Sequence, residues 1–121
     1  MSQVRIKLLS ELFSRWKPAF NSDAQLAYAR YMLPHGFLTL PRMESTKEGE
    51  AAAEEMFDLT NNPSRQLERL MRYGNGRSVS SGDIVEVDGV DYLCCSIGWV
   101  VVEKGQPTDL KLITNFDGHD I

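Results

Sequence analysis

The chain has 121 residues, which is enough for one compact domain and too few for two. Its 17 acidic residues outnumber its 13 lysines and arginines, and the net charge of −4 argues against non-specific binding to nucleic acid. Arg5, Lys7 and Glu11 interrupt the apolar start of the chain, so it does not resemble a secretory signal. No run approaches the roughly 18 apolar residues of a membrane span. We therefore expect a cytoplasmic domain with no membrane segment.

The first 63 residues predict two short strands and two helices. Apolar and basic residues alternate from Val4 to Leu8, which predicts a strand with one buried face. Helical spacing predicts a helix over 21–33, and residues 37–40 form an extended piece. Another helix follows Ser45, which has the spacing of a capping box with Glu48, and ends at residues 61–63.

Residues 64–76, "SRQLERLMRYGNG", predict a third, short helix. Ser64 is placed to cap its first turn, and the glycines at its end form the exit turn. Leu67, Leu70 and Met71 recur at helical spacing, so we expect them to face the core.

The C-terminal third predicts a hairpin. Asp88-Gly89 separates two alternating apolar runs, which is a strong signal for a two-residue turn. Such a turn places Glu86 opposite Asp91, a like-charge pair that we expect only near solvent. The opposite face is therefore the one expected to be buried: Val85, Val87, Val90, Tyr92 and Cys94. Residues 99–102 and 110–113 predict further strands.

These elements predict an α+β domain with about three helices and a small antiparallel sheet built on the C-terminal hairpin, which the first strand can join. We expect one domain over 1–121, with a helical part at about 1–75 and a β-rich part at about 76–114.

Side chains for catalysis or metal binding are scarce. His35 and His119 are the only histidines, and neither lies in a metal-ligand motif. Cys94 and Cys95 are adjacent on a strand, so they point to opposite faces and are poorly placed to form a disulfide. We expect one core cysteine and one half-exposed cysteine. The sequence predicts no catalytic residue, metal or cofactor.

Two charged sets are candidates for partner binding. The acidic set lies on the helix after Ser45 and consists of Glu48, Glu50, Glu54 and Glu55. The basic set is a row on the third helix with one residue in the following turn: Arg65, Arg69, Arg72 and Arg77. The ordinary interpretation of either set is a solvated helix face. In the basic set, Glu68 would then pair with part of the arginine row. On an acidic protein, however, an electropositive row is also a candidate contact for phosphate or for an acidic surface.

Residues 54–103 resemble the YodL-like small domains of mobile genetic elements. The shared pattern is an Asn-Pro step after a helix, "GRSVSSGDIV", a hairpin that carries Tyr92, and "SIGW". Residues 66–75 are longer than usual for the family, and the first 50 residues lie outside the pattern. The resemblance implies an accessory protein of a phage or plasmid, near antirestriction-type genes, and carries no catalytic constellation.

Three functions follow as hypotheses. The first is a non-enzymatic protein-binding module that inhibits a host defence complex of the CRISPR or restriction type, with the acidic helix facing a basic nucleic-acid channel. The second is a nucleic-acid-associated regulator that uses the arginine row. The third is a small enzyme with Cys94 or Cys95 as the nucleophile.

Overall fold

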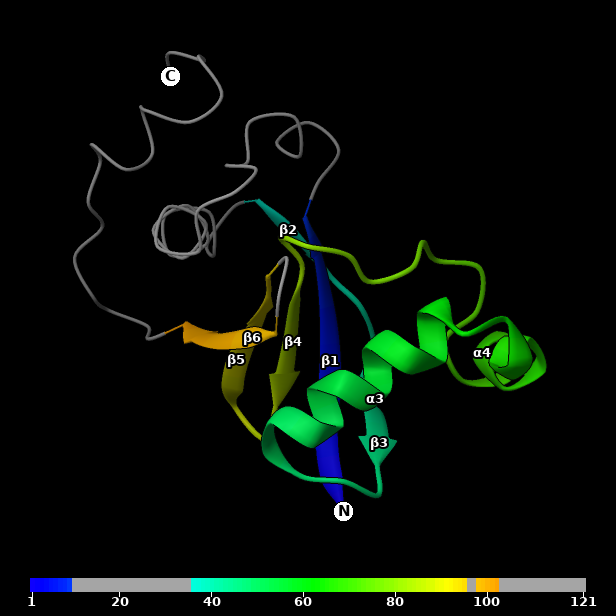
Figure 1. The fold of residues 1–121 in the computed structure, drawn as a ribbon, viewed down its shortest axis with the longest axis horizontal. Helices are drawn as coiled ribbons and strands as arrows, with labels where there is room; N and C mark the ends of the chain where they lie inside the picture. Colours follow the sequence, from blue (N-terminus) through cyan, green and yellow to red (C-terminus); the bar gives the residue numbers. More distant parts are fainter. Residues whose placement is uncertain (10–35, 96–97, 103–121) are drawn as a thin grey trace, which may run out of the picture.

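The computed structural model describes residues 1–9, 36–95 and 98–102, and these form an α+β fold around one antiparallel sheet (Figure 1). The sheet has six strands in the order β2-β1-β4-β5-β6, and β3 also pairs with β1. The strands are β1 (Ser2–Leu9), β2 (Phe37–Thr39), β3 (Met43–Ser45), β4 (Ile84–Val87), β5 (Val90–Cys94) and β6 (Trp99–Val102). The helices are α3 (Gly49–Asn61), the 3-10 turn η1 (Pro63–Arg65) and α4 (Gln66–Arg72).

Strand β1 is the centre of the sheet. One of its edges pairs with β4, and its other edge pairs with β3 near its start and with β2 near its end. The predicted strand over 4–8 is therefore confirmed and is longer than expected. Because strands from the first half of the chain pair with the hairpin, the sheet is larger than one built on the hairpin alone.

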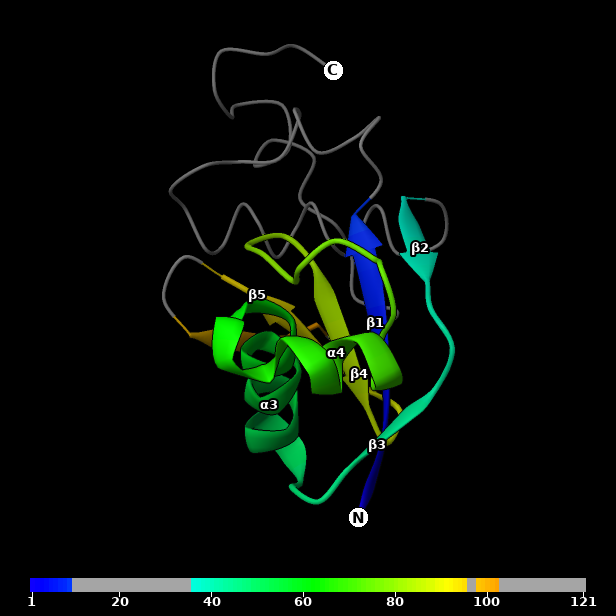
Figure 2. The same ribbon diagram turned by 90° about the vertical axis from the view of Figure 1, so that its right-hand side faces the viewer.

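Helix α3 lies across one face of the sheet, and α4 packs against α3 at the outside of the molecule (Figures 1 and 2). The core between α3 and the sheet is fully apolar at its centre, where Ile6, Val85 and Met56 have no exposed surface. A second buried group lies on the opposite face of the sheet and comprises Ile84, Leu93, Cys95 and Val102. Both faces of the hairpin thus contain buried residues, whereas the sequence indicated one buried face.

The hairpin has the predicted register. Val87 pairs with Val90 and Glu86 lies opposite Asp91, and Asp88 and Gly89 have positive φ values of 48° and 86°. These angles are those of a type I′ turn, which Asp-Gly favours because glycine and aspartate tolerate the left-handed region.

The burial of the like-charge pair corrects the sequence prediction. Asp91 is buried rather than solvent-facing, because Lys7 on β1 reaches both carboxylates. Its Nζ lies 2.9 Å from Oδ1 of Asp91 and 3.0 Å from Oε1 of Glu86. The cation replaces the solvation that the two carboxylates lose, and only the pairing of β1 with β4 brings it there.

Other local predictions were wrong. Helix α3 begins after Glu48 with no side-chain cap, because Ser45 ends strand β3 and its hydroxyl bonds Glu55 instead. Asn62, not Ser64, caps the following 3-10 turn by accepting from the Ser64 amide. Of the three expected helices, the two that fall within the described residues are present, as α3 and α4. The helix expected over 21–33 and the strand expected over 110–113 lie outside the described residues.

Candidate functional site

The loop between α4 and β4 is fastened by one buried carboxylate. Asp83 accepts from both terminal nitrogens of Arg77, at 2.6 and 2.7 Å. It also accepts from the backbone amides of Leu9 and Ser80, at 2.7 and 2.8 Å. Arg77 in turn donates to the Leu9 carbonyl. The predicted contact residue Arg77 therefore ties the loop to the end of β1.

The same loop is tied to the C-terminal end of α3. The hydroxyl of Thr60 accepts from the Val79 amide at 3.0 Å and donates to the Met56 carbonyl. Ser78 donates to the Thr60 carbonyl, and the Asn61 amide donates to the Val79 carbonyl. The "GRSVSSGD" stretch is thus occupied by contacts that hold the fold, as expected for a turn that leads into a strand.

Two arginines of the predicted row form an ion cluster between α3 and α4. Arg65 contacts Glu55, Asp58 and Glu68, with nitrogen–oxygen distances of 3.1, 2.8 and 2.7 Å. Arg72 also reaches Glu68, at 2.8 Å. The hydrogen bonds from these two arginines lower the pKa of Glu68 to about 2. Arg65 and Arg72 therefore hold α4 against α3.

Arg69 differs from its neighbours because its described partners are neutral. Its guanidinium donates to the carbonyls of Thr60 and Gly76 and to the Ser78 hydroxyl, and it lies 5.7 Å from the centre of the Tyr73 ring. No carboxylate contacts Arg69 within the part of the chain that the structure describes. None of the described carboxylates therefore neutralises its positive charge in an ion pair.

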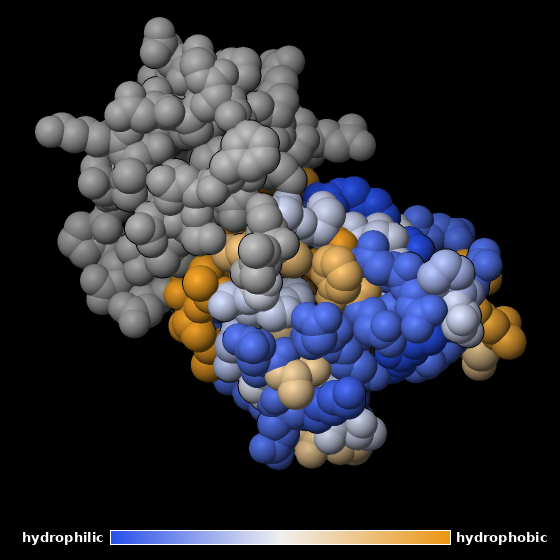
Figure 3. Space-filling model, in the orientation of Figure 1, coloured by the Kyte–Doolittle hydropathy of each residue, from blue (hydrophilic) through white to orange (hydrophobic). Residues whose placement is uncertain are grey.

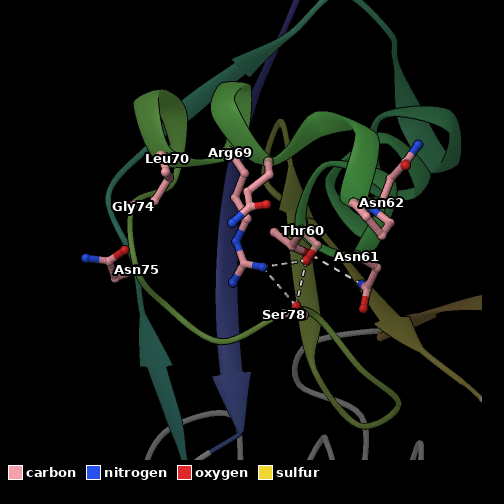
Figure 4. Close-up of a pocket in the computed structure, with 10 residues that line it drawn as sticks. Thr60, Asn61, Asn62, Arg69, Leu70, Gly74, Asn75 and Ser78 are labelled. Atoms are coloured by element: carbon pink, nitrogen blue, oxygen red, sulfur yellow. Dashed lines mark hydrogen bonds between the residues drawn. The ribbon is translucent and has the colours of Figure 1, made fainter.

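Arg69 lines a pocket of about 310 Å³ between the end of α3, α4 and the loop at 74–78 (Figure 4). Asn61 and Asn62 lie on one side of the pocket, and Leu70 and Asn75 lie on the other. The lining is mainly amide and hydroxyl groups, and Arg69 is the only charged residue among the described residues that form it.

Helix α4 presents its apolar side to solvent. Leu67, Leu70 and Met71 are 72%, 49% and 81% exposed, which contradicts the prediction that they face the core. The arginines occupy the inner side instead, because their carboxylate and carbonyl partners are on α3 and β3. Figure 3 shows the resulting hydrophobic surface at the right-hand end of the molecule, over α4.

The acidic set divides into a solvent-facing part and a structural part. Glu48, Glu50 and Glu54 are exposed, whereas Glu55 bonds Ser45, Arg65 and Arg72. Burial alone would raise the pKa of Glu55, but the hydrogen bonds from Ser45 and Arg65 lower it. Glu55 therefore belongs to the ion cluster, and three glutamates remain on the surface.

An apolar ledge adjoins this acidic surface, on the part of the sheet that α3 leaves uncovered. Cross-strand pairing places its four residues on the α3 side of the sheet: Val90, Tyr92, Trp99 and Val101. Val90 and Val101 are 40% and 45% exposed, and the Trp99 indole donates to Glu54 at 2.7 Å. Figure 3 shows a hydrophobic area over β5 and β6 next to the hydrophilic surface of α3.

The cysteines are both buried, at 5% and 6% exposure, so the expectation of one half-exposed thiol was wrong. They do lie on opposite faces of the sheet, as predicted, since Cys94 packs under α3 and Cys95 packs in the second buried group.

His35 and His119 lie outside the described residues. Across 1–9, 36–95 and 98–102, no group of three or more His, Cys, Asp or Glu residues is placed to hold a metal ion. None of the described helices has the length and apolarity needed to cross a membrane.

Comparison of the chain with protein-family models, with curated proteins and with solved structures found no match.

Sequence reasoning found the charged sets and the pairing of the arginine row with Glu68, but it missed their other contacts. The pairing of Arg65 with Glu68 was readable from their spacing of three residues. By contrast, Arg77 and Leu9 are 68 positions apart in the sequence, and no local pattern predicts their contact. The ledge was also missed. Val90 and Val101 are exposed because α3 covers only part of this face of the sheet, and the sequence does not show which part.

Proposed function

We propose that the chain is a non-enzymatic protein-binding module that presents the acidic surface of α3, together with the apolar ledge, to a basic partner surface. The observation that carries this proposal is the juxtaposition of Glu48, Glu50 and Glu54 with the ledge residues. The three glutamates are exposed, and none of them forms an ion pair with a described lysine or arginine.

The chemistry of the surface supports a protein partner. Partly buried aromatic groups and exposed aliphatic groups provide contact area. Carboxylates without an ion-pair partner among the described residues lie beside them, and they select a basic surface and reject an acidic one. Trp99 is held in place by Glu54, so this side chain is already oriented before a partner binds. A pre-oriented aromatic side chain is favourable at an interface because little conformational entropy is lost on binding.

The resemblance to YodL-like domains gives the proposal its finer form. We propose that the partner is a host defence complex of the CRISPR or restriction type, and that the chain belongs to a phage or plasmid. A basic channel that binds nucleic acid is a suitable surface for Glu48, Glu50 and Glu54, because these carboxylates can replace phosphates there.

The alternative is a nucleic-acid-binding regulator that uses the arginine row, and it has weaker support. Arg65, Arg72 and Arg77 each contact a carboxylate of this chain, so their charges are already neutralised. Binding to DNA or RNA that falls steeply with salt would favour this alternative.

The test is affinity capture in a bacterium that carries the parent element, followed by measurement of binding with purified partner. Glu50→Gln and the triple variant E48Q/E50Q/E54Q should weaken binding, and salt should weaken binding of the unaltered chain. The glutamine of Glu54→Gln still has an oxygen that can accept from Trp99, so the ledge is retained.

Glu44→Gln is the matched control, since Glu44 is exposed but lies on the opposite face of the sheet from α3. It removes one charge and should leave binding unchanged. If wild-type chain recovers no stable partner, or if the triple variant binds as tightly as Glu44→Gln, the proposal is wrong.

A further inference from the structure

The pocket beside Arg69 has features that the proposed function does not use. Its volume of about 310 Å³ is near the lower end of the range for ligand sites, so it suits one or two side chains of a peptide better than a large cofactor. It also lies at the α4 end of the molecule, whereas the acidic surface and the ledge lie over α3, β5 and β6 (Figures 1 and 3).

The charge of the pocket favours an anion. Among the described residues of the lining, Arg69 contributes the only charged group, and its described hydrogen bonds end on two carbonyls and one hydroxyl. Because the guanidinium is partly buried, solvent screens it less than a surface charge, and a carboxylate placed beside it gains correspondingly more.

The rim of the pocket offers free amide groups. Gln66 and Asn75 are exposed, and neither side chain makes a hydrogen bond with a described residue. Amide side chains both donate and accept, which suits the alternating N–H and C=O groups of a peptide backbone.

The apolar face of α4 continues from the pocket. Leu70 both lines the pocket and forms part of the exposed row with Leu67 and Met71. These three positions share one side of the helix, at spacings of three and four residues. An anionic group in the pocket therefore has bulky apolar surface directly beside it.

We propose that the Arg69 pocket and the apolar face of α4 together bind a protein segment in which a carboxylate lies next to large apolar side chains. The carboxylate interacts with Arg69, the segment's backbone bonds Gln66 and Asn75, and its apolar side chains cover Leu67, Leu70 and Met71. This site prefers an acidic segment, whereas the surface of α3 prefers a basic one, so the two proposals stand or fall separately.

A random dodecapeptide display library, selected against the whole chain, tests the proposal. Enriched peptides should carry an aspartate, glutamate or free C-terminal carboxylate within a few positions of leucine, phenylalanine or a similar residue. Synthetic copies should shift the amide NMR signals of Leu70, Gly74 and Asn75. Replacement of their acidic group by the corresponding amide should weaken binding by about tenfold.

Variants that spare the fold locate the site. Asn75→Asp puts a negative charge on the exposed rim and should weaken the same peptides by about tenfold. Leu67→Ser and Met71→Ser remove exposed apolar surface and should weaken them as well. The controls are Thr46→Asp, an exposed change of equal charge outside the pocket, and Leu38→Ser, which removes an exposed leucine from β2.

Three results would overturn the proposal. One is enrichment of peptides without acidic groups, or no enrichment at all. Another is binding that Asn75→Asp and Leu67→Ser leave unchanged. The third is a dimer in sedimentation velocity that Leu67→Ser and Met71→Ser dissociate, since a second copy of the chain would then be the occupant of the α4 face.

Discussion

Arg77 and Asp83 form a two-point ion pair in which both guanidinium Nη atoms lie within 2.7 Å of the carboxylate oxygens. Asp83 is 1% exposed, and its two oxygens also receive the amides of Leu9 and Ser80. One carboxylate therefore joins the end of β1, the loop and the start of β4.

Asp83→Asn should destabilise the fold by about 3 kcal/mol, because an amide group would face donors and the buried ion pair between Asp83 and Arg77 would be lost. Urea unfolding followed by circular dichroism measures the loss. Asp58→Asn is the control, since Asp58 also pairs with an arginine but at the surface, and its effect should be much smaller. Equal losses for the two variants would show that the buried carboxylate has no special role.

Lys7→Met should also destabilise the protein, by about 3 kcal/mol, because Asp91 and Glu86 would face each other without the cation between them. Glu86→Gln added to Lys7→Met should recover part of the loss, since it removes the like-charge repulsion. Chemical denaturation of Lys7→Met, Glu86→Gln and the double variant gives the coupling free energy between the two residues. A double variant that is less stable than Lys7→Met would show that Asp91 and Glu86 do not repel each other when Lys7 is removed.

The same cluster predicts how stability depends on alkaline pH. Burial would lower the pKa of Lys7, but its hydrogen bonds to Asp91 and Glu86 raise it above its ordinary value of 10.5. A pKa raised in the folded state contributes stability that is complete below pH 10.5 and disappears as the pH rises through the folded value. The urea midpoint of the wild type should therefore fall more steeply above pH 10.5 than that of Lys7→Met. Parallel curves would exclude this role for Lys7.

Glu68 should titrate at unusually low pH. Hydrogen bonds from Arg65 and Arg72 lower its pKa to about 2, so its part in holding α4 is present above pH 4.5 and is lost as the pH falls toward 2. Carbon-detected NMR of the carboxyl group measures the midpoint directly. The double variant R65Q/R72Q should return the midpoint toward 4.5, and a wild-type midpoint near 4 would show that the ion cluster does not form in solution.

The orientation of α4 predicts that its apolar residues contribute little to stability. Leu67→Ser and Met71→Ser should each change the free energy of unfolding by no more than about 0.5 kcal/mol, because both side chains are already in solvent. Leu59→Ser, on the buried side of α3, should cost several kcal/mol and serves as the comparison. A loss above about 2 kcal/mol for Leu67→Ser would mean that α4 faces the core with its leucines.

Sequence alone determined the elements whose signals are local. The Asp88-Gly89 turn fixes its own pairing, because positive φ at both positions selects one register for the flanking strands. Alternation from Val4 to Leu8 predicted β1, and the sequence at 61–63 predicted the end of α3. Each of these depends on neighbours within a few residues, so a linear pattern contains the needed information.

Only the tertiary structure decided which side of α4 faces inward. The spacing of Leu67, Leu70 and Met71 predicted a buried face, but Glu55 on α3 and the Thr60 carbonyl draw Arg65, Arg72 and Arg69 to that side instead. The burial of Asp91 likewise depends on Lys7, which is 84 positions away along the chain. Charged side chains can be buried and apolar side chains exposed where residues distant in the sequence pair with the charges. The spacing of residues along one helix or strand does not show which distant residues lie close to it in space.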